Sequence, residues 1–335
     1  MEETVLSVVF SLSYSSYLAL SFNQPKFCPT ASWNPSAITF ANQSIVGVRP
    51  TSIFVNTNNT IYVTNQANNT ILVWDEDSGN LTNIISDDFI SSNSLFVTVN
   101  GDLFIDDGQN NSRVQKWIAT TNRFVTVMKV NASCYGLFFD RSENLYCSIY
   151  NQHRVVKGSL TDGDTALVTV VAGTGVAGPA SNELYQPLGI FVDVNMFLYV
   201  ADCGNDRVQL FQSRASTGIT VAGSGSPHPT INLDCPSAIV LDSERYLFIV
   251  DTWSHRIVGS GVNGFRCLVG CYGAGSQSNQ LRGPMSFSFD RSGNMFVNDR
   301  FNHRIQKFMH VESCLGKLKT KYMIRISLAF SPFVQ

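Results

Sequence analysis

A phrase that recurs six times constrains the fold of this chain more than any other feature of its sequence. Its clearest copy runs from Gln186 to Phe211 and contains three short apolar runs, Ile190–Val192, Phe197–Ala201 and Val208–Phe211. The runs are rich in Val, Ile, Phe and Tyr, and polar turns separate them. Runs of this kind predict three antiparallel strands joined by tight turns.

The other copies keep the same internal spacing. Their reference positions are Asn56, Thr98, Asp140, Asp193, Asp242 and Asp290. Six residues after each of these stands an aromatic residue: Tyr62, Phe104, Tyr146, Tyr199, Phe248 and Phe296. A period of about 40–50 residues, with several short strands in each unit, is typical of a β-propeller blade.

A fourth apolar run ends five of the copies: Leu81–Ile85, Phe124–Met128, Val168–Ala172, Ile219–Ala222 and Phe265–Val269. The sixth copy has only a polar stretch after Phe308. The missing strand is found near the N-terminus, at Ala37–Ala41, where the local pattern matches a blade's outer strand. We therefore expect an all-β, six-bladed β-propeller of four-stranded antiparallel blades, in which the N-terminal strand completes the last blade and removes two exposed sheet edges.

This prediction divides the chain into three parts. The propeller spans residues 28–314, with repeats near 50–86, 92–129, 134–172, 186–222, 235–269 and 283–309 plus 36–41. Residues 315–335 are basic and then apolar, fit no repeat, and form a C-terminal extension. Residues 1–22 run apolar from Val5 and predict a secretory signal peptide, although Glu2 and Glu3 stand where such a signal has Lys or Arg, which leaves a cytosolic extension as the alternative.

The phrases Asn151–Val155, Ser254–Ile257 and Asn302–Ile305, each after a strand pair with the Pro/Gly–aspartate–aromatic spacing, resemble the NHL repeat family. The resemblance covers roughly residues 33–308 in six copies that are in phase with one another. It implies a six-bladed propeller that binds a partner. The first two copies depart from it, because they lack the His-Arg pair in register.

Polar residues recur in the turn before the third strand of the second to sixth copies, whereas the first copy has Asn65 and Thr70 at the Asp and Arg positions. The recurring residues are Asp107, Asp202, Asp251 and Asp299, then His153, His255 and His303, then Arg113, Arg154, Arg207, Arg256 and Arg304. We expect local Asp–Arg pairs that fix each turn, with His and Arg bonding turn carbonyls and the preceding Asp. Two alternatives stay open: a ring of carboxylates that binds Ca²⁺, as in lactonase-like propellers, and channel histidines on zinc, as in the peptidyl-hydroxyglycine amidating lyase.

Cysteines and glycosylation sequons favour an extracellular protein. The eight cysteines are disulfide candidates, and the blade scheme brings together Cys134 with Cys147, Cys203 with Cys235, Cys267 with Cys271, and Cys28 with Cys314. The N-x-S/T triplets are at Asn42, Asn58, Asn68, Asn80, Asn110 and Asn131. Reduced cysteines in a cytoplasmic protein are the alternative.

Composition argues against several classes of function. Only 14% of the residues are charged and the net charge is −2, so nothing draws the whole molecule to nucleic acid or anionic lipid. We expect no transmembrane segment, because no 18 consecutive residues are apolar. Ala172–Gly178 and Gly270–Ser276 lead into strands rather than helices, so they are connections and not phosphate loops, and no cofactor or metal is expected.

These observations predict a secreted, monomeric, non-enzymatic propeller that binds an unknown protein or glycan on a loop face. The first alternative is an intracellular RNA- or protein-binding module of the kind linked to ubiquitin ligases, although the chain lacks RING and B-box cysteine clusters. The second is a metal-dependent enzyme resembling the amidating lyase or lactonases.

Overall fold

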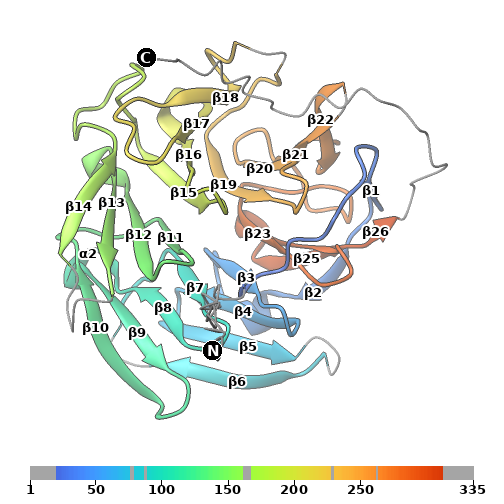
Figure 1. The fold of residues 1–335 in the computed structure, drawn as a ribbon. Helices are drawn as coiled ribbons and strands as arrows, with labels where there is room; N and C mark the ends of the chain where they lie inside the picture. Colours follow the sequence, from blue (N-terminus) through green and yellow to red (C-terminus); the bar gives the residue numbers. More distant parts are fainter. Residues whose placement is uncertain are drawn as a thin grey trace, which may run out of the picture.

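The computed structural model describes residues 20–75, 79–86, 89–160, 167–227, 230–261 and 263–311. Six four-stranded antiparallel sheets stand in a ring around a central axis (Figure 1). The prediction of an all-β, six-bladed propeller is confirmed. None of the helices in the described part of the chain is long and apolar enough to cross a membrane.

Each of the first five blades consists of four strands that follow one another in the sequence. Blades 1 and 2 contain β3 (Ile53–Val55), β4 (Thr60–Asn65), β5 (Thr70–Asp75), β6 (Leu81–Ser86), β7 (Leu95–Val97), β8 (Leu103–Asp106), β9 (Arg113–Ile118) and β10 (Arg123–Lys129). Blades 3 and 4 contain β11 (Gly136–Phe139), β12 (Asn144–Ile149), β13 (Arg154–Ser159), β14 (Val168–Ala172), β15 (Pro187–Val192), β16 (Leu198–Asp202), β17 (Arg207–Phe211) and β18 (Ile219–Gly223). Blade 5 contains β19 (Pro236–Leu241), β20 (Leu247–Asp251), β21 (Arg256–Gly261) and β22 (Gly264–Val269).

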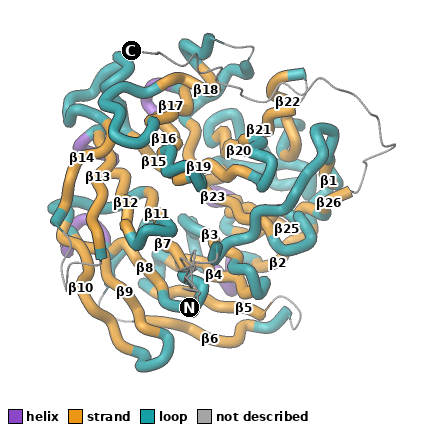
Figure 2. Tube along the Cα trace, viewed as in Figure 1, coloured by secondary structure: helices purple, strands orange, loops and turns teal. Residues whose placement is uncertain are grey.

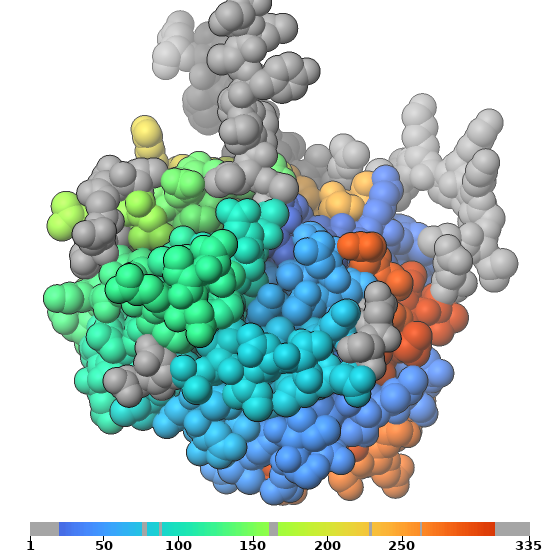
Figure 3. Space-filling model, turned by 90° about the horizontal axis from the view of Figure 1, so that it is seen from below, coloured from blue at the N-terminus to red at the C-terminus, as the bar shows by residue number. Residues whose placement is uncertain are grey.

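Blade 6 combines the two ends of the repeat region. Its strands β23 (Pro284–Phe289), β24 (Met295–Asp299) and β25 (Arg304–Phe308) are completed by β2 (Ile38–Ala41). In this pair Ile38 lies opposite Lys307 and Ala41 opposite Ile305. The expected closure by the N-terminal strand is therefore confirmed, and an edge-on view shows the blue N-terminal segment beside the red strands of blade 6 (Figure 3).

A second strand pair reinforces this closure. β1 (Ser32–Trp33) pairs with β26 (His310–Val311), so Trp33 lies opposite His310. The absence of a fourth blade strand after Phe308 is confirmed, whereas this additional short pair was not predicted. A two-residue strand carries no periodic signal, and the pairing depends on Trp33, which is buried against Phe27, Phe248 and Phe289.

All six repeated aromatic residues are buried, and two of them, Phe104 and Phe248, contact a ring of the next blade. The Phe104 ring centre lies 4.9 Å from that of Phe139 in blade 3. The Phe248 ring centre lies 5.1 Å from that of Phe289 in blade 6. Burial of one such side chain stabilises the fold by about 1.5–3 kcal/mol, which explains why this position is aromatic in every copy.

The turns between second and third strands share one backbone form. In blades 3, 4 and 6 a short 3₁₀ turn, Tyr150–Gln152, Cys203–Asn205 or Arg300–Asn302, precedes a single residue in the left-handed region. Blade 2 has a short helix here instead, α2 (Gly108–Asn111), and another, α1 (Gln43–Val46), leads into blade 1. These turns and loops gather at the strand ends, on the two faces of the disc (Figure 2).

Candidate functional site

The ring encloses an axial cavity of about 450 Å³. Its wall is supplied mainly by the first strands of all six blades: β3, β7, β11, β15, β19 and β23. A volume in the range of about 300–1,000 Å³ is usual for small-molecule sites. The cavity is therefore the first candidate for a binding site.

One end of the cavity is occupied by the Phe22 side chain. Its ring centre lies 6.3, 5.7 and 5.6 Å from those of Phe96, Phe138 and Phe191, which belong to three different blades. The neighbouring Asn23 donates from Nδ2 to the carbonyl oxygens of Asn56 and Phe289. Residues 21–27, which precede the expected start of the propeller at residue 28, thus pack as part of the disc.

The opposite end carries polar and aromatic side chains that we call the rim: Tyr135, Tyr150, Gln186, Trp253 and Arg300. They come from second-to-third-strand turns and blade entries. The rings of Tyr135 and Tyr150 lie 5.0 Å apart with an interplanar angle of 33°. Trp253 is 49% exposed. The cavity is therefore lined with apolar side chains inside and ringed by hydrogen-bonding groups at this end.

Four rim side chains have no hydrogen-bonding partner in the described part of the chain: the phenols of Tyr135 and Tyr150, the Gln186 carboxamide and the Arg300 guanidinium. The Arg300 Nε is buried as well as unpaired. Buried polar groups are normally satisfied within a folded protein, so this Nε is unusual, whereas Tyr135, Tyr150 and Gln186 are half-buried. A cluster of open donors and acceptors at the end of a cavity is thus suited to a ligand.

Burial sets the charge of these groups. It raises the pKa of the Tyr135 and Tyr150 phenols, so both are neutral at physiological pH. Burial and then the nearby Arg49 lower the pKa of Arg300, and the Tyr135 phenol opposes this shift. A guanidinium stays protonated in proteins, so the rim carries one positive charge among neutral hydrogen-bonding groups.

Phe301 connects the rim to blade 1. Its ring stacks on Trp253 with centres 5.8 Å apart, and the guanidinium carbons of Arg49 and Arg300 each lie 5.7 Å from its centre. Gly283 makes room for this ring, because a methyl group there would collide with Phe301. Three consecutive blades thus contribute to one aromatic and cationic surface.

The Asp–Arg column forms local pairs, as expected from the sequence. Arg Nε lies 2.5 Å from Asp Oδ2 in the Arg113–Asp107 pair, 2.8 Å in Arg207–Asp202, 2.9 Å in Arg256–Asp251 and 2.7 Å in Arg304–Asp299. Burial raises the pKa of Asp202, Asp251 and Asp299, against hydrogen bonds and the Arg charges that favour ionisation. Arg154, whose blade has Ile149 in the Asp position, bonds Gln152 instead. Each carboxylate also accepts a backbone N–H from the entry of its blade, so it is engaged in contacts that hold its own turn and blade entry together.

The histidines have a different role from the expected one. Nδ1 of His153, His255 and His303 accepts the backbone N–H of Gln186, Gly283 and Arg49 respectively, at 3.1–3.2 Å. We had expected these histidines to bond turn carbonyls and the preceding Asp. Each instead joins its blade to the entry of the next one.

Other residues in the same column make the same connection. Asp206 accepts the N–H of Cys235, and Asn69 accepts that of Ser91. At this repeat position the residue has a left-handed backbone conformation, and its side chain accepts a hydrogen bond from the next blade. His, Asp and Asn all provide such an acceptor and tolerate positive φ, so they replace one another at this position. No three His, Cys, Asp or Glu side chains in the described ranges lie close enough together to hold a metal ion.

Three disulfides join cysteines that the sequence analysis had brought together: Cys134–Cys147, Cys203–Cys235 and Cys267–Cys271. The fourth expected pair, Cys28 with Cys314, falls partly outside the described residues because Cys314 does. Cys203 and Cys235 both line the axial cavity. Disulfides persist in oxidising compartments, so these three are typical of a protein that works outside the cytoplasm.

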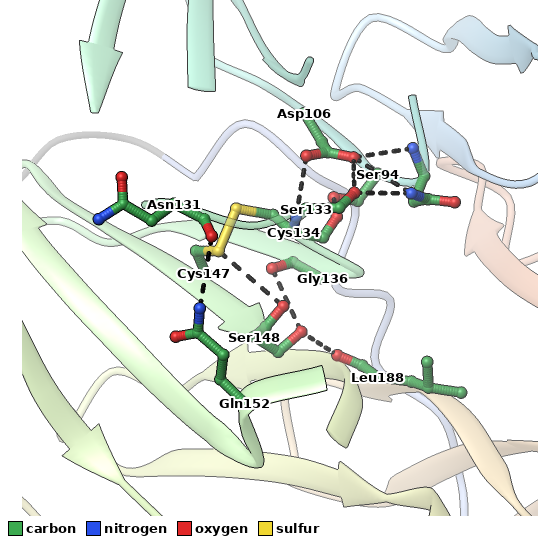
Figure 4. Close-up of a disulfide and its surroundings, with 11 residues drawn as sticks. Ser94, Asp106, Asn131, Ser133, Cys134, Gly136, Cys147, Ser148, Gln152 and Leu188 are labelled. Carbon is green, nitrogen blue, oxygen red and sulfur yellow. Dashed lines mark hydrogen bonds between the residues drawn. A yellow bond between two sulfur atoms is a disulfide. The ribbon is translucent and has the colours of Figure 1, made fainter. Parts of the chain in front are cut away.

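A buried carboxylate lies beside the first of these disulfides (Figure 4). Asp106 accepts hydrogen bonds from the backbone N–H of Cys134 and Asn93 and from the Ser133 hydroxyl. Burial raises its pKa to about 6, although these bonds favour the ionised form. The sequence analysis missed Asp106, which stands one position before the repeated Asp column.

Sequence reasoning also missed the rim. Two rim residues, Tyr150 and Arg300, occupy the position just after the repeated Asp column, where Cys203 and Thr252 of other blades line the cavity and each blade has a different residue. That variation was the available signal, since a shared structural role would have kept one residue type. All six sequon asparagines are exposed, and Asn42 also caps α1 by accepting from the Ser44 N–H.

The architecture and its closed ring define this chain as a six-bladed β-propeller. Similar solved structures include an auxiliary nutrient binding protein from Bacteroides thetaiotaomicron, with a TM-score of 0.63 at 14% identity over 88% of this chain and 76% of that one. A streptogramin B lyase has a TM-score of 0.59 at 12% identity over 85% of this chain and 100% of the other. A gluconolactonase from Xanthomonas campestris has a TM-score of 0.60 at 12% identity, over 88% and 98%.

These likenesses establish the fold and include both binding proteins and enzymes. No protein-family model matches the sequence, and no curated protein does so.

Proposed function

We propose that this protein is a secreted, non-enzymatic propeller that binds the end of a glycan at the rim of its axial cavity. The four unpartnered polar side chains of the rim carry this proposal, because they offer hydrogen bonds that the fold itself does not use. Aromatic faces beside such groups suit sugar rings, whose C–H faces are apolar and whose edges are polar. The open cavity behind them accommodates one sugar unit.

The ionisable groups of the cavity favour binding over catalysis. Apart from the disulfide-bonded cysteines, the ionisable lining residues are Tyr135, Tyr150 and Arg300. Two neutral phenols of raised pKa and a permanent cation make poor general bases at neutral pH. The Asp and His columns, which the lactonase-like and lyase-like alternatives would need, are engaged in turn and inter-blade contacts.

A glycan array followed by titration tests this function. We expect Tyr150→Ala and Gln186→Ala each to weaken binding of the selected glycan about tenfold, because each removes an open rim group. Tyr272→Ala is the matched control, since Tyr272 is 60% exposed and does not line the cavity. We expect the glycan to be recovered chemically unchanged after incubation with the protein. Consumption of the glycan, or binding that ignores both rim variants, would contradict the proposal.

Secretion and membership of the NHL type are also proposed. Three disulfides and six exposed sequon asparagines support passage through an oxidising, glycosylating compartment. The recurring turn with its Asp–Arg pair supports the NHL assignment. Mass spectrometry of protein from its own cells should show cleavage after Ala19 or Ser21, which keeps Phe22, glycans on some of the six asparagines and oxidised cysteines. Free thiols and an intact N-terminus would favour the cytoplasmic alternative. A profile built from close relatives that matches other propeller repeats better than NHL repeats would overturn the family assignment.

A further inference from the structure

Arg300, which belongs to the rim, and Arg49, which lies beside it at the entry of blade 1, are two arginines without an acidic partner. Arg49 and Arg300 flank the Phe301 ring at equal distances, and no ion pair in the described ranges includes either of them. Their mutual repulsion contributes to the lowered pKa of Arg300. The guanidinium groups therefore create a local positive potential on a protein whose net charge is −2.

An unpaired, partly buried guanidinium is costly, and an anion bound to it offsets that cost. The Nε of Arg300 is inaccessible to solvent and makes no hydrogen bond. The planar guanidinium presents paired N–H groups that match the two oxygens of a carboxylate. The geometry thus prepares Arg300 for a bidentate anionic ligand.

The charges around the rim favour a single negative charge over two. The Asp106 carboxylate is close enough to raise the pKa of the Tyr135 phenol, so negative charge already lies beneath the rim. A phosphate monoester, which is close to doubly charged at neutral pH, would have to be neutralised by two arginines on one side alone. A carboxylate needs less positive charge, and the phenols and the Gln186 carboxamide remain available for neutral hydroxyl groups.

We propose that the rim binds a glycan that ends in a hexuronic acid, with its carboxylate on Arg300 and with Arg49 providing additional positive potential. This inference rests on the proposed glycan-binding function and specifies the chemical class of the ligand. The sugar ring lies between the Tyr135–Tyr150 pair and Trp253. The alternative source of a carboxylate, a peptide C-terminus, lacks the ring that these aromatic faces would cover.

Fluorescence of Trp253 provides the measurement. Trp33, Trp74 and Trp117 are buried, whereas Trp253 is 49% exposed, so a ligand at the rim changes mainly its emission. The protein is titrated with D-glucuronate and with D-glucuronamide, a neutral molecule of the same shape. We expect glucuronate to bind at least tenfold more tightly and its advantage to fall at high salt.

Variants identify which arginine is responsible for the preference for glucuronate. Arg300→Gln should remove the preference for glucuronate over glucuronamide, Arg49→Gln should reduce it a few-fold, and Arg300→Lys should retain part of it because the charge stays and the planar fork is lost. Arg214→Gln is the matched control: it also removes one exposed positive charge, on a surface loop of blade 4. Circular dichroism shows whether each variant is folded. If Arg300→Gln does not fold, Arg49→Gln and Arg300→Lys still test the proposal.

The outcomes separate the two proposals. Equal binding of glucuronate and glucuronamide, or an unchanged preference in Arg300→Gln, overturns the carboxylate site and leaves glycan binding intact. Tighter binding of acetyl-trialanine, with its free carboxylate, than of glucuronate overturns the sugar assignment. If no sugar, acidic or neutral, binds at the rim in either assay, the glycan-binding function itself fails.

Discussion

The backbone N–H of Arg49 donates to Nδ1 of His303 at 3.1 Å, which attaches the entry of the first blade to a turn of the last. The same bond recurs at two other blade junctions through His153 and His255. Here, however, it also places Arg49 beside Phe301 and Arg300. Ring closure and the proposed binding site thus depend on one junction.

Removal of Arg207 should destabilise the fold more than removal of any other arginine in its column. Its side chain is 8% exposed, pairs with the buried Asp202, and donates to the carbonyls of Pro179, Ala180 and Glu183. Loss of one partner from a buried pair costs about 3–5 kcal/mol, so Arg207→Ala should lower the free energy of unfolding by about 3 kcal/mol in urea denaturation. Arg113→Ala is the control, and about 1 kcal/mol is expected because the Arg113 side chain is 34% exposed. Equal losses would show that burial does not set the strength of these pairs.

The Asp106 carboxylate should make stability depend on pH. Its pKa is about 6 in the folded protein and near 3.8 when exposed, so the folded state binds a proton more readily. This contribution is fully present below about pH 4 and is lost as pH rises through 6, and it amounts to roughly 3 kcal/mol at most. Unfolding measured from pH 4 to 7 should therefore show a downward slope in the native protein that is smaller in Asp106→Asn. The slope of the unfolding free energy against pH is compared, and not its absolute value, because the Asn side chain in the variant also changes the hydrogen bonds to Cys134 and Ser133. Parallel pH profiles would refute the raised pKa.

Loss of the Cys203–Cys235 disulfide should cost more than loss of Cys267–Cys271. The first closes a loop of 32 residues and the second a loop of 4. In the chain-entropy description the two contribute about 4 and about 2 kcal/mol. Denaturation of the two double-alanine variants under non-reducing conditions measures the difference. A larger loss for the shorter loop would mean that native packing, and not loop closure, dominates.

Packing of the Phe40 side chain should hold the closing strand β2 in blade 6. Its ring centre lies 5.6 Å from that of Trp74 in blade 1 and 5.2 Å from that of Phe296 in blade 6. Phe40→Ala should lower the free energy of unfolding by about 3 kcal/mol, as is usual for such truncations. Ile38→Ala in the same strand is the control, with at most about 0.5 kcal/mol expected because Ile38 is 60% exposed. If both variants are equally stable, closure does not depend on aromatic packing.

A methyl group at Gly283 should disturb the rim. Gly283 has φ of 57°, and an added Cβ would collide with the Phe301 ring, which stacks on Trp253. Gly283→Ala should therefore change Trp253 emission and weaken glucuronate binding several-fold. Gly273→Ala shares the positive φ but meets nothing within 4 Å, so it should cost only backbone strain of about 1 kcal/mol and leave binding unchanged. Identical binding by both variants would remove Phe301 from the site.

The sequence alone determined the blades and their closure. Strand signals are local, and the aromatic column from Tyr62 to Phe296 repeats because the side chain at this position is buried in every blade. The Asp–Arg pairs could be predicted for the same reason, since both partners lie within six residues. The histidine column was visible, but its acceptor role was not, because the donor lies in the next blade.

Only the tertiary structure decided what faces the axis. Phe22 precedes the first repeat, and its position at the end of the cavity depends on three blades being in place. Tyr150, Trp253 and Arg300 meet at the rim because the ring brings together turns that are far apart in the chain. A repeat pattern records what the blades share, whereas this site consists of the residues in which they differ. The physical reason is that closure of the ring, and no local interaction, sets the distances between those residues.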